Sequence, residues 1–372
     1  MTDDELTARR TRDLGIVVGA LPTGVHNALT DVPGVRVGHT TIVDPPRLHT
    51  GVTAIVPDAL GPDRCSLPCG LFVGNGFGKL IGATQVAELG ALETPILLTA
   101  TLSAFRAADA LVTYVLASPG HETTRTLNPV VGETNDGRLS DIRARPVTEA
   151  HVLAALDGAT PGAVAEGCVG AGTGTMALGF KGGIGTSSRL VGDWTVGALV
   201  QSNFSGTLTV RGVPIPADDG AVPAGTDRPG TGGPEPEGNS CMIVVATDAP
   251  LDARQLGRVA RRAVFAMGRV GSDFTGGSGD YALAFSTPGA ASAEGVPRAA
   301  EVADGDLDPL FAATMDAVEE ALLNSVLTAT TTVGHRGTAT AVPHELVLRR
   351  LRDAGVLAAG RAGQPWAAGP AS

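Results

Sequence analysis

Aromatic and charged residues are scarce in this chain of 372 residues: aromatics make up 3% and charged residues 17%. Basic residues are also outnumbered, because 27 Lys and Arg stand against 38 Asp and Glu and leave a formal net charge of −11. Neutralising nucleic-acid phosphates needs clustered Lys and Arg, and no basic patch stands out in the sequence. We therefore expect no general affinity for nucleic acid.

Long apolar stretches are missing as well. No segment reaches about 18 uninterrupted apolar residues, the length typical of a membrane-spanning helix. The first 15 residues, MTDDELTARRTRDLG, are polar and of mixed charge, and the apolar stretch of a signal peptide does not follow them. The sequence therefore predicts a cytoplasmic protein that has no membrane partner.

The four cysteines are too few and too scattered for a metal site. Cys65 and Cys69 are four residues apart, Cys168 and Cys241 lie far away, and no histidine is near enough to complete a ligand set. We expect all four to be reduced and structural, and we expect neither a metal nor a cofactor.

Glycine and apolar residues are abundant instead. With 43% hydrophobic residues and 51 glycines, the chain is typical of a globular protein with many tight turns. Apolar runs predict strands over 35–39, 51–57, 95–101, 194–200, 242–246 and 281–285, a strand, loop and helix over 71–90, and helices over 103–116 and 308–327. This order indicates layered sheets with helices outside them.

A further helix is predicted after the strand at 242–246. Thr247, Asp248, Ala249 and Pro250 supply the capping side chain and the proline of a helix start. Apolar residues then recur at helical spacing, namely Leu256, Val259, Ala260, Ala263, Val264 and Met267. We expect this helix to cover the sheet.

The junction at 238–246, Gly-Asn-Ser-Cys-Met-Ile-Val-Val-Ala, is the most informative stretch. A run of Pro, Gly, Asp and Glu over 214–238 predicts a flexible segment, and a core strand follows it without a turn. If the bond between Asn239 and Ser240 were cut, Ser240 would carry a hydroxyl nucleophile and an amine base of pKa about 8 in one residue. The alternative is an ordinary turn formed by the Asn-Ser pair.

Three other positions place polar side chains at the ends of predicted strands. Glu133 precedes an Asn-Asp-Gly turn, where the local sequence alone favours a solvated loop carboxylate over a binding role. Asn203 follows the strand at 194–200 and could donate to an oxyanion or form a turn. Ser278 and Asp280 stand two apart at the entrance of the strand at 281–285, so both could point into one cleft.

Two glycine-rich segments do not support a nucleotide site. The Gly-Asn-Gly at 74–76 lacks the Gly-Lys-Ser/Thr ending of a Walker motif. The glycine series at 167–189 is followed by more strand and turn, whereas a dinucleotide fingerprint needs a helix there. Bulges and backbone N-H groups aimed at a ligand are the interpretation that this spacing favours.

Taken in order, the motifs resemble the DmpA-like P1 family of serine aminopeptidases, which includes L-aminopeptidase/D-Ala-esterase/amidases and beta-peptidyl aminopeptidases. The resemblance covers nearly the whole chain. It is carried by TRDLGI, NALTDVPGVRVGHT, GNG, PVVGETNDG, GTGTMALGFKGGIGTSSR, VGALVQSNF, NSCMIVVATDAPL, SGDYALAFST and NSVLTATTTVG.

The resemblance implies an α/β fold, a four-layer αββα sandwich of the DmpA/ArgJ type that is similar to N-terminal nucleophile hydrolases but connected differently. It implies one self-processing domain over 1–372, cut between Asn239 and Ser240 into an alpha chain, 1–239, and a beta chain, 240–372. A homotetramer of such alpha-beta units is implied too, with short peptides, aminoacyl amides or esters as substrates.

The resemblance also implies roles for single residues. Ser240 matches the nucleophile, Asn203 the oxyanion donor, and Glu133 the carboxylate that binds the free amine of the substrate. Ser278 and Asp280 match a pair that orients and tunes the nucleophile.

Two positions depart from the family pattern. Asp280 stands where beta-peptidyl members carry Glu, and Asn135 occupies the neighbourhood in which some members place a Tyr. Activity on beta-peptides therefore does not follow from the resemblance.

Two alternatives remain open at this stage. Acetyl-transferring enzymes of arginine synthesis, which act on ornithine, share the architecture but use a Thr nucleophile where this chain has Ser240. An uncleaved protein that binds or assembles on the same scaffold, without the chemistry, is the other.

Overall fold

The computed structural model describes residues 8–61, 66–217, 239–288 and 302–357. Cys65, most of the flexible run predicted over 214–238 and the C-terminal tail at 358–372 lie outside the described residues. The other three cysteines, Cys69, Cys168 and Cys241, are free thiols. Among the described helices, none has both the length and the apolar character that crossing a bilayer requires.

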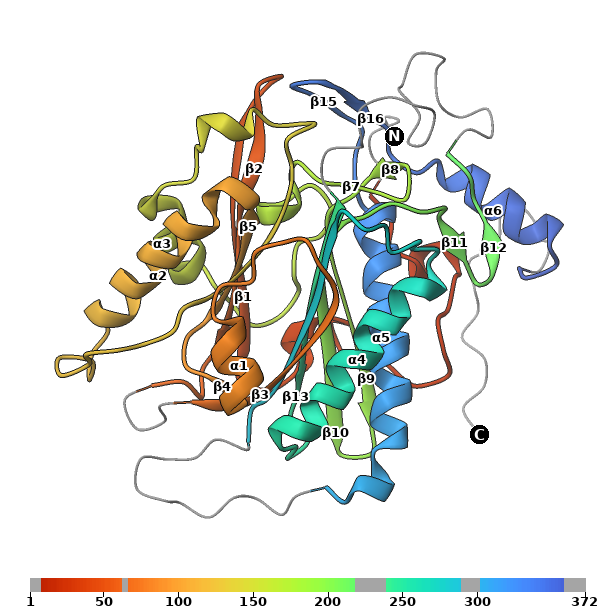
Figure 1. Ribbon diagram of the computed structural model, residues 1–372. Helices are drawn as coiled ribbons and strands as arrows, with labels where there is room; N and C mark the ends of the chain where they lie inside the picture. The colour runs from red at the N-terminus through yellow and green to blue at the C-terminus, as the bar shows by residue number, and fades with distance from the viewer. Residues whose placement is uncertain (1–7, 62–65, 218–238, 289–301, 358–372) are drawn as a thin grey trace.

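Two sheets form the centre of the molecule (Figure 1). The first has the order β1-β2-β5-β6, with bounds Val35–Asp44, Leu48–Pro57, Ile96–Ala100 and Val130–Thr134. The second has the order β4-β3-β14-β13-β10-β9, with bounds Ala91–Leu92, Leu67–Gly76, Ser278–Ser286, Asn239–Thr247, Trp194–Asn203 and Ile184–Val191. Short two-stranded pairs complete the strands: β7 and β8 at Met176–Ala177 and Phe180–Lys181, β11 and β12 at Thr209–Val210 and Val213–Pro214, and β15 and β16 at Thr332–Gly334 and Gly337–Ala339.

Helices cover the outer face of each sheet. Helices α2 (Ala104–Ala117) and α3 (Glu149–Asp157) lie on the first sheet, and α4 (Ala253–Arg269) and α5 (Asp308–Leu327) lie on the second (Figure 1). The other α-helices of the described residues are α1, Ala83–Leu89, and α6, His344–Asp353. The prediction for α5 is confirmed at both ends.

The side-chain alternation of β13 explains why the sheets stack between two helical layers. Cys241, Ile243 and Val245 pack in a core with α4 and α5, whereas Met242 and Val244 pack in a second core between the sheets. A third core joins the first sheet to α2 and α3. Because successive strand residues point to opposite faces, one apolar run fills two cores. The predicted αββα sandwich is confirmed.

The predicted start of α4 was wrong. The helix begins at Ala253, where Asp252 accepts the backbone N-H of Gln255 at 2.7 Å and the Gln255 side chain returns a contact to the Asp252 N-H at 3.1 Å. Thr247 and Asp248 instead bind β10, since the Thr247 hydroxyl donates to the Thr195 carbonyl at 2.8 Å. A capping box five residues later therefore outcompetes the Thr-Asp pair. The apolar stripe of the helix is buried as predicted.

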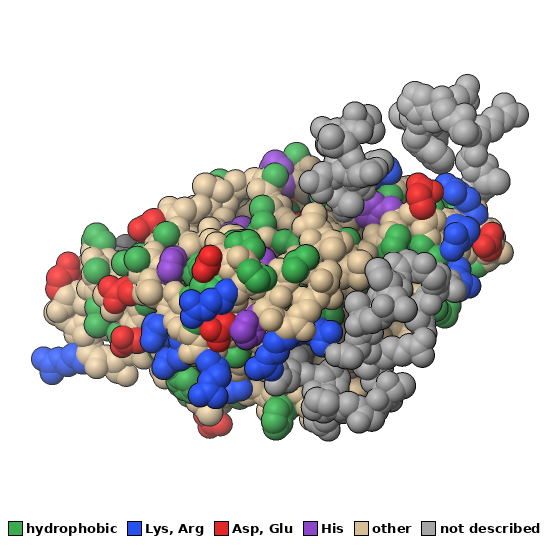
Figure 2. All heavy atoms as spheres, turned by 90° about the horizontal axis from the view of Figure 1, so that it is seen from above, with side chains coloured by type: hydrophobic (Ala, Val, Ile, Leu, Met, Phe, Trp, Pro, Cys, Tyr) green, Lys and Arg blue, Asp and Glu red, His purple; other side chains and the backbone are tan. Residues whose placement is uncertain are grey.

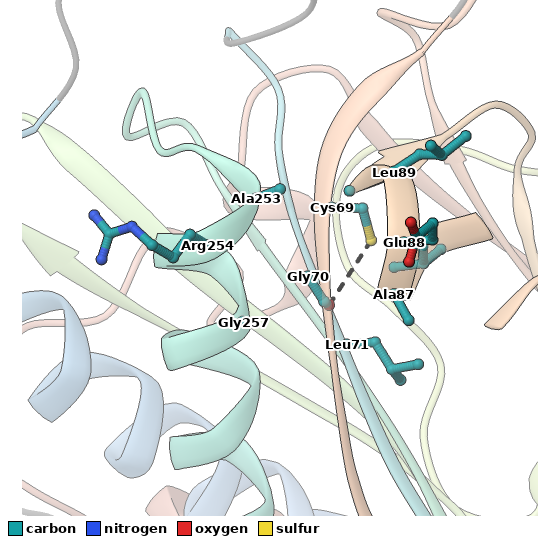
Figure 3. Close-up of a pocket in the computed structure, with 11 residues that line it drawn as sticks. Cys69, Gly70, Leu71, Ala87, Glu88, Leu89, Ala253, Arg254 and Gly257 are labelled. Carbon is teal, nitrogen blue, oxygen red and sulfur yellow. Dashed lines mark hydrogen bonds between the residues drawn. The ribbon is translucent and has the colours of Figure 1, made fainter. Parts of the chain in front are cut away.

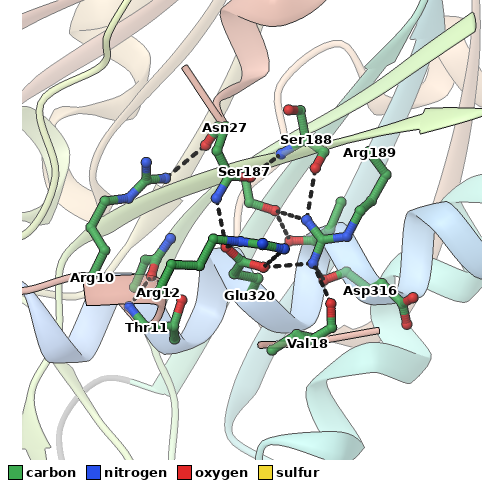
Figure 4. Close-up of polar contacts among 12 residues, drawn as sticks. Arg10, Thr11, Arg12, Val18, Asn27, Ser187, Ser188, Arg189, Asp316 and Glu320 are labelled. Carbon is green, nitrogen blue, oxygen red and sulfur yellow. Dashed lines mark hydrogen bonds and ion pairs between the residues drawn. The ribbon is translucent and has the colours of Figure 1, made fainter. Parts of the chain in front are cut away.

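A buried ion pair ties the N-terminal segment to the second sheet and α5 (Figure 4). The Arg189 guanidinium on β9 donates to Glu320 Oε2 on α5 at 2.6 Å, and both side chains are 0% exposed. Arg12 reaches Glu320 Oε1 at 2.8 Å, and Asn27 donates to the same oxygen. Burial pushes the pKa of Glu320 up, but the two arginines and Asn27 hold it below its usual value.

The surface carries charges of both signs. Lys and Arg side chains lie beside Asp and Glu side chains on the face drawn in Figure 2. Surface ion pairs are partly exposed, as in the contact between Arg36 Nε and Asp58 Oδ1 at 2.6 Å, where the side chains are 31% and 50% exposed. Such pairs contribute little because water screens them.

We expect Glu320→Gln to lower the free energy of unfolding by about 3–5 kcal/mol, because it leaves the buried Arg189 charge without its carboxylate. The matched control Asp58→Asn breaks an exposed pair and should cost about 0–1 kcal/mol. Since the folded-state pKa of Glu320 is depressed, its contribution is present at neutral pH and is lost as the pH falls through that pKa. Denaturant unfolding of the two variants measures the difference, and equal losses would contradict the assignment.

Candidate active site

Ser240 is the second residue of β13, near the centre of the six-stranded sheet, and is 3% exposed. β13 runs antiparallel to β10 and parallel to β14. The register places Asn203 of β10 opposite Ser240 on one side and Gly279 of β14 opposite it on the other. Asn203, Ser240 and Gly279 therefore form one row across the sheet, and Gly279 is the residue between Ser278 and Asp280.

The Ser240 hydroxyl faces the space between the two sheets, because Ser240 has the same parity as Met242 and Val244. It donates a hydrogen bond to the carbonyl oxygen of Asn239, and it accepts one from the Gly279 N-H at 3.3 Å. The Ser240 hydroxyl thus lies beside the carbonyl of the bond whose cleavage the sequence predicts.

Gly279 leaves room for this hydroxyl. A Cβ atom at this position would lie 3.2 Å from Ser240 Oγ and 2.8 Å from the Gly78 Cα atom. A side chain would push the two backbones apart, so glycine permits a close approach here. Gly78 lies between this sheet and the carboxylate of Glu133.

Glu133 reaches the site from β6, the edge strand of the first sheet. Its side chain is 2% exposed, so the interpretation as a solvated loop carboxylate was wrong. Oε1 accepts the backbone N-H of Lys79 at 2.8 Å, and Lys79 Nζ lies 3.8 Å from the same oxygen. Burial raises the pKa of Glu133, and the Lys79 contacts oppose that shift only in part.

The segment 77–82 connects the two sheets beside the site. The Phe77 N-H donates to the Ser278 carbonyl of β14 at 3.0 Å, and Ile81 exchanges two backbone hydrogen bonds with Val131 of β6. A Cβ atom at Gly78 would lie 3.3 Å from Glu133 Oε1 and 3.1 Å from the Gly279 Cα atom. Gly78 therefore sits between the Glu133 carboxylate and the strand beside Ser240.

Tyr281 is a neighbour of the site that the motif comparison missed. Its hydroxyl donates to the Gly78 carbonyl at 3.0 Å, and a Cβ atom at Gly78 would lie 3.0 Å from its ring. Burial raises the pKa of Tyr281, and the Glu133 charge raises it further. A tyrosine near the glutamate thus comes from β14 and not from the neighbourhood of Asn135. The chain has only two tyrosines, which is the one signal that could have drawn attention to it.

Asn203 is the last residue of β10, whereas the sequence placed it just beyond the strand. The strand is longer because pairing with Ser240 extends it to Asn203. Asn203 Oδ1 accepts the Met176 N-H at 2.9 Å, and Nδ2 donates to the Asn135 carbonyl at 3.0 Å. Asn135 therefore contributes a main-chain oxygen, which its side-chain type does not reveal.

Ser278 and Asp280 lie within β14 and not in a loop before it. Ser278 Oγ donates to Asp280 Oδ1 at 2.7 Å, and both side chains are buried. They share a face with Ala282 and Ala284, which pack toward α4 and α5, so they lie on the opposite face from the Ser240 hydroxyl. The fold places Ser278 and Asp280 beside the main chain of Ser240, but not in the space between the sheets, which the Ser240 hydroxyl faces.

Asp280 and Asn239 have partners on this helical side of the sheet. Burial raises the pKa of Asp280, while Ser278 and Asn75 lower it. Asn239 pairs in register with Ser278, and its side-chain amide donates to Thr275 Oγ1 at 3.0 Å. Asn239, which precedes the bond predicted to be cut, is therefore held in the sheet through both its main chain and its side chain.

A groove elsewhere in the molecule does not belong to this site. It lies between α1 and α4 beside β3 and contains none of the predicted site residues (Figure 3). In the four described ranges, no three His, Cys, Asp or Glu side chains are grouped to hold a metal ion.

Comparison with known proteins supports the resemblance. The chain is 41% identical to "Beta-peptidyl aminopeptidase BapA" of Sphingosinicella xenopeptidilytica, over 93% of this chain and 92% of that protein. The crystal structure of the PH0078 protein from Pyrococcus horikoshii OT3 has a TM-score of 0.85 and 41% identity, covering 94% of this chain and all of the other.

The L-aminopeptidase D-Ala-esterase/amidase of Ochrobactrum anthropi is another similar structure, described as a variant of the Ntn hydrolase fold. Its TM-score is 0.84 at 37% identity, over 94% of this chain and 99% of that one. A sequence profile of the family described as "Peptidase family S58" matches residues 27–340. With the fold, the relatives and the profile in agreement, the chain belongs to peptidase family S58.

Proposed function

We propose that the chain cuts its own bond between Asn239 and Ser240 and then uses Ser240 to release N-terminal residues from short peptides, aminoacyl amides or esters. Membership of the family makes it a hydrolase, a serine aminopeptidase of the DmpA type. The observation that carries the finer proposal is the contact between the Ser240 hydroxyl and the Asn239 carbonyl in a buried strand.

Self-cleavage would begin with attack of Ser240 Oγ on the Asn239 carbonyl carbon. The peptide C-N bond breaks, the Ser240 nitrogen takes the hydroxyl proton and leaves as an amine, and an ester joins the two residues. Water then hydrolyses the ester to the Asn239 carboxylate and the free hydroxyl. An N-terminal serine with its own amine as base is the product.

Turnover would use the same atoms. Ser240 Oγ attacks the first carbonyl of the substrate, and its amine takes the proton and returns it to the leaving group. Asn203 lies opposite Ser240 in register, so its Nδ2 would donate to the oxyanion after leaving the Asn135 carbonyl. Water completes the cycle by hydrolysing the acyl-enzyme.

The remaining residues would select the substrate and tune the base. A buried Glu133 carboxylate would bind the substrate's ammonium and so restrict cleavage to the first residue. Ser278 and Asp280 would act on the freed Ser240 amine from the neighbouring strand, because their side chains lie on the other face from its hydroxyl. A single domain over 1–372, a homotetramer and a cytoplasmic location stay predictions.

We expect Ser240→Ala to abolish both maturation and hydrolysis, because it removes the only atom that performs both attacks. Ser240→Thr is the matched control, since it keeps a hydroxyl and should still yield two fragments. Intact-mass measurement reads the result: a processed chain gives two species, and an unprocessed one gives a single species of 37.4 kDa. Two fragments from Ser240→Ala, or wild-type protein whose N-terminal sequencing never reads Ser-Cys-Met, would refute self-cleavage and favour a binding protein.

We expect Asn203→Ala to lower kcat about a hundredfold to a thousandfold, because it removes one oxyanion donor. Maturation and turnover are both to be measured, since both pass through an oxyanion. Asn135→Ala is the control: the acceptor that Asn203 contacts is its main-chain oxygen, so kcat should change little. Equal kcat values for the two variants would remove Asn203 from the mechanism.

We expect Glu133→Gln to damage hydrolysis of free-amine substrates by at least tenfold while leaving the slow reaction on N-acetylated analogues unchanged. In the wild type, the raised pKa of Glu133 means that the clamp is charged above that pKa and fails as the pH falls through it. The Glu133 step in the acid limb of kcat/KM should therefore lie above the range of an ordinary glutamate and disappear in Glu133→Gln, while the step of the Ser240 amine remains. The same loss on both substrate types would argue against the clamp.

A further inference from the structure

Lysine is rare in this protein, and nearly all of its basic residues are arginines. The chain has two lysines, Lys79 and Lys181, among 27 Lys and Arg. Lys181 is fully buried and donates to the carbonyl oxygens of Gly172 and Gly182 at 3.0 and 2.7 Å. Lys79 is the accessible one, and its side chain is 44% exposed beside the Glu133 carboxylate.

Lys79 contacts one oxygen of Glu133 in two different ways. Its backbone N-H donates to Oε1 at 2.8 Å, which is an ordinary hydrogen bond, whereas its Nζ lies 3.8 Å from Oε1, beyond hydrogen-bond distance. The backbone contact fixes the carboxylate because segment 77–82 is itself bonded to both sheets. The side-chain contact is loose, and its flexible stem leads to solvent.

The opposite charges of Lys79 and Glu133 make this loose contact important for the binding of an ammonium group. Glu133 is 2% exposed, and among the described residues Lys79 is the one cation within ion-pair distance of it. A buried carboxylate gains most from a single close cation, and a primary ammonium is the group that both Lys79 and an aminopeptidase substrate present. The two ammonium groups cannot both occupy the same place on Oε1.

We propose that Lys79 is a tethered competitor for the ammonium subsite of Glu133, so that it determines specificity without taking part in the chemistry. This inference rests on the proposed function of Glu133. In the empty enzyme the Lys79 ammonium neutralises the carboxylate. A substrate with a free amine replaces that charge and releases Lys79 to water, whereas an N-acylated substrate brings no charge with which to displace it.

Two substitutions at position 79 should move KM in opposite directions. Lys79→Met keeps the length of the stem and removes the charge, so KM for a free-amine aminoacyl amide should fall about two- to fivefold at pH 8, the range of a partly exposed ion pair. Lys79→Arg offers a planar fork that binds a carboxylate through two hydrogen bonds, so KM should rise. In both variants kcat should stay close to the wild-type value.

Two further readouts separate competition from a structural role. Inhibition by n-butylammonium ion probes the subsite without chemistry, and its inhibition constant should fall in Lys79→Met by the same factor as KM. Lys79 lowers the pKa of Glu133, so its removal should move the Glu133 step in the acid limb of kcat/KM to higher pH. Complete processing and an unchanged denaturation midpoint would show that the variant folds.

An unchanged or higher KM in Lys79→Met, or a lower KM in Lys79→Arg, overturns the inference. Failure of the proposed function would look different. If Glu133→Gln retained full activity on free-amine substrates, the subsite itself would be wrongly assigned. If Glu133→Gln lost that activity while Lys79→Met kept the wild-type KM, the clamp would stand and only the competitor would be excluded.

Discussion

Backbone pairing of β13 with β10 and β14 is the constraint on which the site depends. Ser240 occupies the second position of this strand, and both neighbours hold it through their ladders. The pairing places Asn203 on one side of Ser240 and Gly279 on the other, and the main-chain register alone fixes these positions. It also holds the carbonyl of Asn239 beside the Ser240 hydroxyl. A buried strand is rigid, and such rigidity is what positioned nucleophiles need.

Alternation along the same strands separates chemistry from packing. The Ser240 hydroxyl points between the sheets, whereas Cys241 and the pair of Ser278 and Asp280 point toward the helices. The Asp280 carboxylate can therefore lie on the strand next to Ser240 and still be separated from the Ser240 hydroxyl by the sheet. Any influence of Asp280 on Ser240 therefore acts at the main chain of Ser240 and not at its hydroxyl. Cleavage would create the amine at the main-chain nitrogen of Ser240.

The first sheet completes the site through one short connection to the second. Segment 77–82 bonds to β14 through Phe77 and to β6 through Ile81, so it fixes the spacing between the sheets at this point. Gly78 lies at the crossing because a side chain would collide with Tyr281 and Gly279. Glu133 is consequently held near β14 by the backbone N-H of Lys79, whereas the Lys79 side chain makes only a loose contact with it.

Sequence alone determined the layers and the family, because apolar periodicity and an ordered series of motifs are local properties of the chain. It failed on strand ends and on the α4 start, since pairing partners and a capping box decided those. It also misjudged Glu133, because burial arises when segment 77–82 closes over β6. Only the tertiary structure could separate the faces of Ser240 and Ser278 or bring Tyr281 and Lys79 to Glu133, since these relations depend on register between strands distant in sequence.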